Sequence, residues 1–315
     1  MTTEWQQYLE QFGELQEGRL QDIAHKPSAS ASGWLAELSP MVPVAVTGAD
    51  AEAFLHGQLS ADLSRLGPDQ CLLTAWHDAR GRIQSLMHLF RQEQRLVLIL
   101  PEELLDAILK RLRMYVLRQD VHFERLDGDL VLTGMLGADP ASAPTRGAHL
   151  AGIQGLSLHL GTVTESIALW DELVAAGWQV LTWEAWRARE IALGIPRILA
   201  PTQGTFLPQF VDLERFEGLH YDKGCYIGQE VIARTHHLGT VKRGLYQAHA
   251  RTAVPTGEEV RDGDGASAGQ VLDCAPEEGG FRVQMVLRHS NTDGDLKLAD
   301  GTPLEALVRG SGAAA

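Results

Sequence analysis

The chain has 315 residues, which is enough for a large core and for two or three structural units. Its 27 basic and 41 acidic side chains give a net charge of −14, which argues against a broad nucleic-acid-binding surface, because phosphate contacts need clustered Lys and Arg. No apolar run is long enough to cross a bilayer, and the acidic N-terminus lacks the features of a secretory signal, so we expect a cytoplasmic protein.

The first 33 residues are expected to form a docked extension. The apolar side chains that recur there at helical spacing predict one amphipathic helix: Trp5, Tyr8, Leu9, Phe12 and Leu15. This aromatic stripe is more typical of packing than of a ligand site. The Pro-, Ser- and Gly-rich run at 26–33 then predicts a linker.

Residues 34–150 predict a first mixed α+β unit, because short apolar runs alternate with helical patterns. Strands are expected at 42–46, 71–77, 83–90, 96–100, 121–126 and 130–136. One helix should follow Asp50, and another should begin at Pro101 and run to about Leu117, with Pro at its first position. The turn at 77–81 separates two of the strands.

Residues 151–238 predict a second mixed unit, which follows a loop rich in Pro, Ala and Gly. Strands are expected at 156–160 and 178–182, and helices at 166–176 and 183–193. After Gly239 the pattern changes to short alternating apolar runs that are separated by Gly, Asp and Pro clusters. Residues 239–315 therefore predict a small all-β unit, most simply a barrel.

The three cysteines, Cys71, Cys225 and Cys274, are far apart and show no CxxC or Cys/His ligand spacing. We therefore expect neither a disulfide framework nor a metal site, which fits a reducing cytoplasm. The adjacent histidines at 236–237 have no third ligand at a sensible spacing, and a surface pair explains them better than a metal does.

The most informative segment is KGCYIGQEVIAR at 223–234. If Cys225 lies in the first turn of the helix that follows, the helix dipole would favour its thiolate, and Lys223 would add a positive charge nearby. The glycines at 224 and 228 allow close backbone approach. The alternative is that Cys225 is a small buried apolar residue.

This segment resembles the signature of the YgfZ-type folate-binding proteins, which carry Lys-Gly-Cys, an aromatic residue and then Gly-Gln-Glu. The runs that resemble other family segments are TGAD at 47–50, GQLSAD at 57–62, DARG at 78–81, GIP at 194–196 and FLPQ at 206–209. The resemblance covers roughly Val42 to the end of the chain.

The resemblance implies the α+β fold of the glycine-cleavage T-protein: a ring of two mixed α/β units and a C-terminal β-barrel, with folate in a central channel. The expected boundaries are 1–33, 34–150, 151–238 and 239–315. It also implies folate-dependent support of iron–sulfur cluster assembly or repair, and of tRNA methylthiolation by an iron–sulfur enzyme. Cys225 would be the functional cysteine, and Lys223 its companion.

By the same resemblance, tetrahydrofolate or a folate derivative is the expected cofactor, with Trp186, Arg80, Tyr226 and Gln229 as the residues that bind it. A pterin needs an apolar or aromatic slot with a few placed polar groups, and Arg80 suits the carboxylate of the glutamyl tail. The alternatives are that Trp186 packs in a core and that Arg80 lies at an exposed hairpin tip. The partners implied are iron–sulfur enzymes, without extensive nucleic-acid contact and without a membrane.

Two departures from the family of folds bear on activity. The T-protein has paired aspartates shortly after the glycine that corresponds to Gly81, whereas this chain has Ser85 and Leu86 there and no carboxylate, which argues against aminomethyl transfer. Related proteins often have a glutamate where this chain has Ala192, and Glu190 is no simple substitute because it lies roughly 200° away around a helix. Whether the chain catalyses a reaction stays open; a one-carbon transferase and a scaffold without folate are the alternatives.

Overall fold

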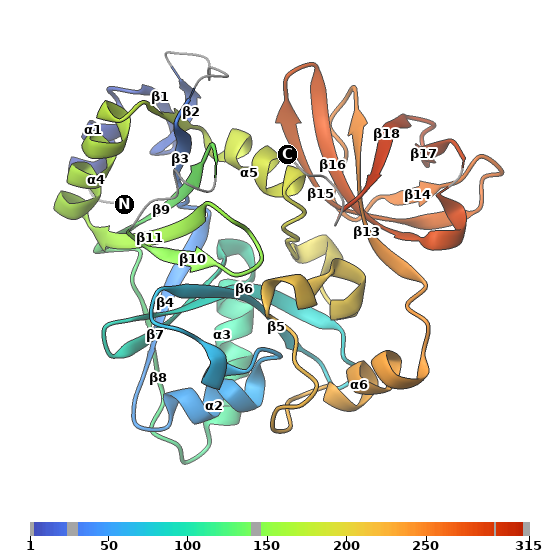
Figure 1. Ribbon diagram of the computed structural model, residues 1–315, viewed down its shortest axis with the longest axis horizontal. Helices are drawn as coiled ribbons and strands as arrows, with labels where there is room; N and C mark the ends of the chain where they lie inside the picture. The colour runs from blue at the N-terminus through green and yellow to red at the C-terminus, as the bar shows by residue number, and fades with distance from the viewer. Residues whose placement is uncertain (1–2, 24–30, 140–145, 293, 311–315) are drawn as a thin grey trace. The chain divides into compact units, whose positions relative to one another are not determined.

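The computed structural model of the protein describes residues 3–23, 31–139, 146–292 and 294–310. The chain forms two compact units (Figure 1). Unit 1 comprises Met1–Leu55, Leu63–Leu73 and Met87–Trp186, and unit 2 comprises His56–Asp62, Thr74–Leu86 and Arg187–Ala315. These borders do not follow the four domain boundaries expected from the sequence, which stay a prediction.

A mixed sheet of ten strands confirms the predicted α+β class. Its strands lie in the order β12-β3-β9-β11-β10-β5-β6-β7-β4-β8, with the parallel pairs β12–β3 and β10–β5. The bounds are β3 Gly33–Glu37, β4 Met41–Thr47, β5 Gln70–His77, β6 Ile83–Gln92, β7 Arg95–Pro101, β8 His122–Arg125, β9 Leu130–Gly137, β10 Ala148–Leu150, β11 Leu156–Thr162 and β12 Trp178–Leu181. Strands β5 and β6 each have residues in both units.

Helices α3 (Glu102–Val116) and α4 (Val163–Ala175) cover parts of the sheet in unit 1. The buried face of α3 carries apolar residues at helical spacing, from Leu104 to Leu112, and it packs on β4 and β7. Helix α4 begins at a capping box, in which the Thr162 hydroxyl accepts the Glu165 N–H and the Glu165 carboxylate accepts the Thr162 N–H. Both helices were predicted from their apolar periodicity.

The N-terminal segment corrects one prediction. Helix α1 ends at Leu9 (Thr3–Leu9), and strands β1 (Gly13–Gln16) and β2 (Arg19–Ile23) form a hairpin in place of a longer helix. Gly18 has a φ of 80°, which the turn requires and a helix cannot accommodate. The aromatic residues do pack as expected: the Trp5 and Trp170 rings lie 5.2 Å apart, edge to face. Most of the expected linker, residues 24–30, lies outside the described residues.

Unit 2 holds the helices α5 (Trp183–Ala192, except its first turn) and α6 (Gln229–Leu238), with several short 3-10 turns between them. The predicted barrel is closed, in the order β13-β16-β15-β14-β17-β18. Its strands are β13 Arg243–Ala250, β14 Glu259–Arg261, β15 Ser267–Glu277, β16 Gly280–Arg288, β17 Leu296–Leu298 and β18 Pro303–Arg309. Alternate residues of these strands fill its core, as Tyr246, Ala248 and Ala250 do on β13.

Within the described ranges, no helix has the length and apolar character needed to span a membrane.

Candidate functional site

Cys225 lies in the loop at 221–228 that leads into α6, called the cysteine loop below, and its side chain is exposed. The N-cap of α6 is Gly228, so Cys225 precedes the helix and does not lie in its first turn. The condition on which the helix dipole would favour the thiolate is therefore not met, because that effect falls off within the first turn. What the structure provides at Cys225 is access to the sulfur.

Gln229 holds this loop together. Its side-chain carbonyl accepts the backbone N–H of Tyr226 at 3.3 Å, and its amide nitrogen donates to the carbonyls of Tyr221 and Lys223, each at 3.3 Å. Backbone groups on both sides of Cys225 are thus bonded to one side chain. Gln229 was predicted as a folate-binding residue; in the structure its amide is used within the loop.

Lys223 directs its ammonium group at backbone carbonyls. The Nζ atom donates to the carbonyl of Leu59 and to that of Ala61, each at 2.8 Å, and to that of His56. His56 lies in the last turn of α2 (Ala51–Gln58), where a cation is favoured by the helix dipole. Burial lowers the pKa of Lys223 to about 8, although the negative charge of Asp62 opposes this shift. Lys223 therefore fastens the loop to residues 56–61.

Two buried side chains with polar atoms, Tyr226 and His77, lie next to each other at the cysteine loop. The Tyr226 ring is 6% exposed; its centroid lies 5.1 Å from the Lys223 Nζ and 6.1 Å from the His77 ring. Neither the Tyr226 hydroxyl nor either ring nitrogen of His77 has a hydrogen-bond partner among the described residues. Burial, with a smaller contribution from the Lys223 charge, lowers the pKa of His77 to about 3. His77 is therefore a neutral imidazole under the cysteine loop.

The neutral state of His77 predicts a pH dependence of stability. In the unfolded chain His77 takes up a proton near its ordinary pKa of about 6.5, and in the folded protein it does not, so stability is lost as the pH falls below 6.5. For this one group the loss should be roughly 2 kcal/mol between pH 6.5 and pH 5. Urea denaturation of wild type and His77→Leu at both pH values measures it.

The His77→Leu protein should lose less stability than wild type over this interval. His237→Leu, which removes an exposed histidine, is the matched control and should keep the wild-type slope. Parallel pH profiles for wild type and His77→Leu would contradict the prediction.

The turn after His77 lies against the cysteine loop. The Asp78 carboxylate accepts the backbone N–H groups of Arg80 and Arg82, each at 2.9 Å, and Gly81 has a φ of 72°. A Cβ atom on Gly228 would come within 2.5 Å of the Asp78 carbonyl oxygen and 2.8 Å of the Gly81 Cα. The two sequence motifs therefore meet backbone to backbone, and the Arg80 side chain is exposed beside this contact.

Trp186 belongs to unit 1, whereas the cysteine loop and Arg80 belong to unit 2. The Trp186 ring is 1% exposed and packs on the backbone of Gly134, where a Cβ atom would meet the ring at 2.5 Å. Its indole N–H is buried and has no partner among the described residues. Packing explains the ring, and the unsatisfied donor is the feature that a ligand could use.

The residues at the positions that carry aspartates in the T-protein are buried in this protein. Ser85 is fully buried on β6, where its hydroxyl donates to the Leu86 carbonyl at 3.2 Å, and Leu86 is 4% exposed. Glu190 is likewise committed, because its carboxylate accepts from Arg197 at 2.5 Å. None of these three residues offers an accessible group that could exchange a proton with a substrate.

A buried ion network around Glu190 was not predicted from the sequence. Arg187 lies 4.0 Å from Glu190 and forms an ion pair with Asp273, and all four members, Arg197 included, are at most 8% exposed. The i,i+3 spacing of Arg187 and Glu190 was the only signal in the sequence. Asp273 is far away along the chain, so its part in the network was not visible.

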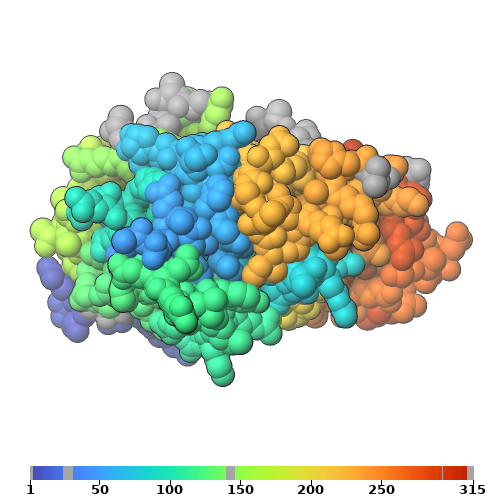
Figure 2. Space-filling view, turned by 90° about the horizontal axis from the view of Figure 1, so that it is seen from below, coloured from blue at the N-terminus to red at the C-terminus, as the bar shows by residue number. Residues whose placement is uncertain are grey.

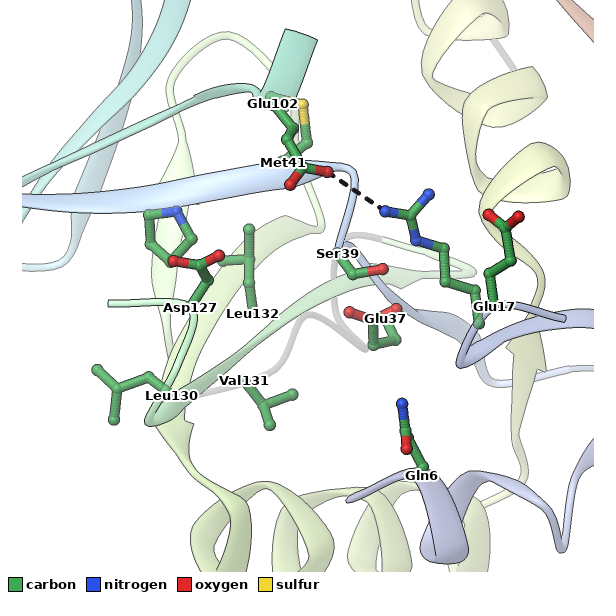
Figure 3. A pocket seen from close by; sticks show the side chains of 12 residues that line it. Gln6, Glu17, Glu37, Ser39, Met41, Glu102, Asp127, Leu130, Val131 and Leu132 are labelled. Atoms are coloured by element: carbon green, nitrogen blue, oxygen red, sulfur yellow. Dashed lines mark hydrogen bonds and ion pairs between the residues drawn. The ribbon is translucent and has the colours of Figure 1, made fainter. Parts of the chain in front are cut away.

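A cavity of about 190 Å³ in unit 1 was also unexpected. Glu17, Glu37, Glu102 and Asp127 line it together with one cation, Arg19, which pairs with Glu102 (Figure 3). Burial is the main reason that the pKa of Glu37 is raised to about 7. This acidic lining would repel the anionic tail of a folate, and the volume is below that of ordinary cofactor sites.

The comparisons with known proteins agree with this geometry. The fold is that of the glycine-cleavage aminomethyltransferases: the aminomethyltransferase T of the glycine cleavage system from Bartonella henselae matches with a TM-score of 0.68 and 17% identity, over 89% of this chain and 85% of that chain. No family model matches the chain.

Sequence similarity to curated proteins shows which family within this fold the chain belongs to. A tRNA-modifying protein YgfZ from Yersinia pestis is 33% identical over 245 residues, 71% of this chain and 74% of that protein. One from Cronobacter sakazakii is 30% identical over 278 residues, 80% of this chain and 83% of that protein. The chain belongs to the YgfZ family.

Proposed function

We propose that this protein is a tetrahydrofolate-binding accessory protein of tRNA modification, which supports the assembly or repair of iron–sulfur clusters in a tRNA methylthiotransferase. Membership of the YgfZ family and the aminomethyltransferase-like fold support the role in tRNA modification. The finer role rests on the cysteine loop. A cytoplasmic location belongs to the same proposal, and the three unpaired thiols fit a reducing compartment.

The observation that carries the proposal is the exposed thiol of Cys225 on a loop that is held in place by hydrogen bonds. Cys225 is exposed, while Gln229 forms three hydrogen bonds with the backbone of its loop and Lys223 donates three more to the carbonyls of residues 56, 59 and 61. A merely structural cysteine is expected to be buried, as Cys71 is. The bracing keeps the sulfur presented to a partner, whether it acts as a nucleophile or as a transient ligand of iron.

The residues fit a folate only in part. Trp186 offers a buried indole N–H without a partner, and Arg80 offers an exposed guanidinium that suits a glutamyl carboxylate. Tyr226 offers a hydroxyl that is likewise unsatisfied, whereas the Gln229 amide is occupied. Bound tetrahydrofolate would supply a carrier of one-carbon units; the residues of this chain would bind and orient it.

A folate-dependent transferase is the second candidate, and the shared fold favours it. The burial of Ser85 and Leu86 at the positions of the aspartates argues against the T-protein reaction. Tetrahydrofolate-dependent release of ammonia from an aminomethyl-lipoyl carrier would decide for it. A scaffold that binds no folate is the third candidate.

The test is rescue of a deletion strain, with tRNA methylthiolation as the readout and protein levels matched. Wild type and Cys274→Ala should rescue, because Cys274 lies in the barrel and its thiol is not fully exposed. Cys225→Ala should leave methylthiolation at the level of the deletion strain, while the circular dichroism and melting temperature of the protein stay unchanged, because the side chain is exposed.

Calorimetry with tetrahydrofolate separates the candidates. The proposal expects binding by wild type and by Cys225→Ala alike, since it assigns the thiol to a partner and not to folate. Rescue by Cys225→Ala would refute the role of the cysteine. Rescue by wild type without folate binding would favour the scaffold.

A further inference from the structure

The C-terminal end of α3 presents an exposed surface that neither the fold nor the cysteine loop explains. It comprises residues 110–118, KRLRMYVLR, and is called the 110–118 patch below. The patch lies entirely within unit 1. Figure 2 shows this part of the chain, in green, at the surface of the molecule.

The patch contains large apolar side chains that are exposed to solvent. Met114 is 70% exposed, Tyr115 45% and Leu117 88%, and these are three of the five exposed large hydrophobic residues among the described ones. The opposite face of α3 is buried through Leu105, Ile108 and Leu112, so packing of the helix does not require the outer residues to be apolar. Single exposed apolar residues are ordinary, but a cluster of this kind marks an interaction site.

The backbone conformation at the end of the patch is a second unusual feature of this surface. Leu117 has a φ of 48° and a ψ of −100°, a combination that residues with a Cβ atom rarely adopt. Here the position holds a leucine whose side chain is almost fully exposed, so the folded protein gains no burial in return.

The charge of the patch is opposite to that of the chain. Residues 110–118 contain four cations, Lys110, Arg111, Arg113 and Arg118, and no carboxylate occurs between Ala107 and Gln119, although the net charge of the chain is −14. All four side chains are exposed. Cations near a helix C-terminus complement the helix dipole, but that effect accounts neither for Arg118, which lies beyond the helix, nor for the apolar side chains.

The side chains form one contiguous surface. At about 100° per residue, Lys110, Met114, Arg111 and Tyr115 occupy successive positions over roughly 140° of the helix. Cations therefore alternate with a thioether and a phenol ring around the outer face. Tyrosine rings and arginine guanidinium planes are the groups on which unstacked bases lie, and the same cations pair with phosphates.

We propose that the 110–118 patch binds a single-stranded segment of RNA, such as a loop of the tRNA whose modification the protein supports; the biological setting rests on the proposed function, but the binding itself does not. Phosphates would contact Lys110, Arg113 and Arg118, and a base would stack on Tyr115. A partner protein would suit Met114 and Leu117 as well, yet four cations in nine residues favour a polyanion.

Fluorescence anisotropy with labelled RNA tests this, using the full-length protein without folate. The probes are an unmodified tRNA transcript, a single-stranded oligonucleotide and a blunt duplex of equal length. Wild type should bind the first two with salt-dependent affinity and the duplex at least tenfold more weakly. Lys110→Gln/Arg113→Gln/Arg118→Gln should weaken tRNA binding at least tenfold at 100 mM salt and reduce the slope of log affinity against log salt by about 2, at ~0.7 per contact.

The matched control removes the same charge elsewhere. Arg65→Gln/Arg146→Gln/Arg251→Gln changes three exposed arginines outside the patch and should bind as wild type does. Tyr115→Ala should weaken binding several-fold, and Tyr115→Phe, which keeps the ring, should not. Cys225→Ala should bind RNA normally, so a failure of the proposed function leaves this result unchanged.

Three results would overturn the inference: no salt-dependent binding by wild type, equal losses in the two triple variants, or equal binding of duplex and single strand. Patch variants that bind RNA normally but fail to support tRNA modification in cells would assign the surface to a protein partner and would overturn it as well.

Discussion

Replacing Arg187 with methionine should lower the free energy of unfolding by about 3–5 kcal/mol, because it leaves a buried charge without its partner. Asp273 is 2% exposed and pairs with Arg187, and its other described contact is a bond from the Cys274 N–H at 2.7 Å. The carboxylate cannot recover its hydration inside the protein. Urea denaturation at pH 7 measures the loss.

Two further variants show that the effect comes from burial. Arg187→Met/Asp273→Leu removes both charges and should recover part of the loss, because a buried ion pair is worth little relative to apolar residues of similar volume. Arg251→Met removes one member of an exposed pair with Glu305, whose side chains are 82% and 52% exposed, and should cost at most about 1 kcal/mol. If Arg187→Met were no worse than Arg251→Met, the network would not be a stabilising feature.

Gly228→Ala should destabilise the protein by about 3–4 kcal/mol and weaken rescue in cells. The φ of Gly228 is 82°, which costs an alanine about 1–2 kcal/mol, and the new Cβ would lie 2.5 Å from the Asp78 carbonyl oxygen. The obstructing atoms belong to the backbone of the turn at 78–81 and cannot rotate away. Either the turn or the cysteine loop must move.

Gly265→Ala is the control for this prediction. Gly265 has the same φ of 82°, but nothing lies within 4 Å of its missing Cβ. It should therefore show only the conformational cost of about 1–2 kcal/mol and full rescue. Thermal denaturation of both variants separates the two contributions, and equal losses of stability would show that the close contact at Gly228 has no energetic weight.

Local patterns were sufficient to predict most elements of the fold. The apolar spacing from Leu104 to Leu112 predicted α3, and alternation after Gly239 predicted the barrel. The helix expected through Phe12 and Leu15 was wrong because the apolar spacing continues across a hairpin. There Gly13 lies against the Asp22 backbone, with 1.9 Å between a hypothetical Cβ and the Asp22 oxygen, a contact that periodicity cannot reveal.

Of the candidate site, the sequence could predict the motif that contains Cys225 but not the contacts that its residues make. The sequence drew attention to Lys223 and Cys225, but it could not show that Lys223 binds carbonyls more than 160 residues away. The sequence also left open whether Cys225 lies in the first turn of the following helix, and only the N-cap at Gly228 shows that it does not. The Arg187–Asp273 pair joins α5 to a barrel strand and left no trace in local spacing.

The bracing of the cysteine loop has a consequence for the speed of encounter with a partner. A reactive residue on a mobile loop must first find its competent conformation, and the observed association rate falls by the fraction of time spent elsewhere. Since the backbone on both sides of Cys225 is bonded to Gln229, and Lys223 donates to three carbonyls, little of the association rate should be lost to a search for the competent loop conformation. Under the proposed function, a lower cellular concentration of the protein would then suffice for the same rate of encounter with a partner.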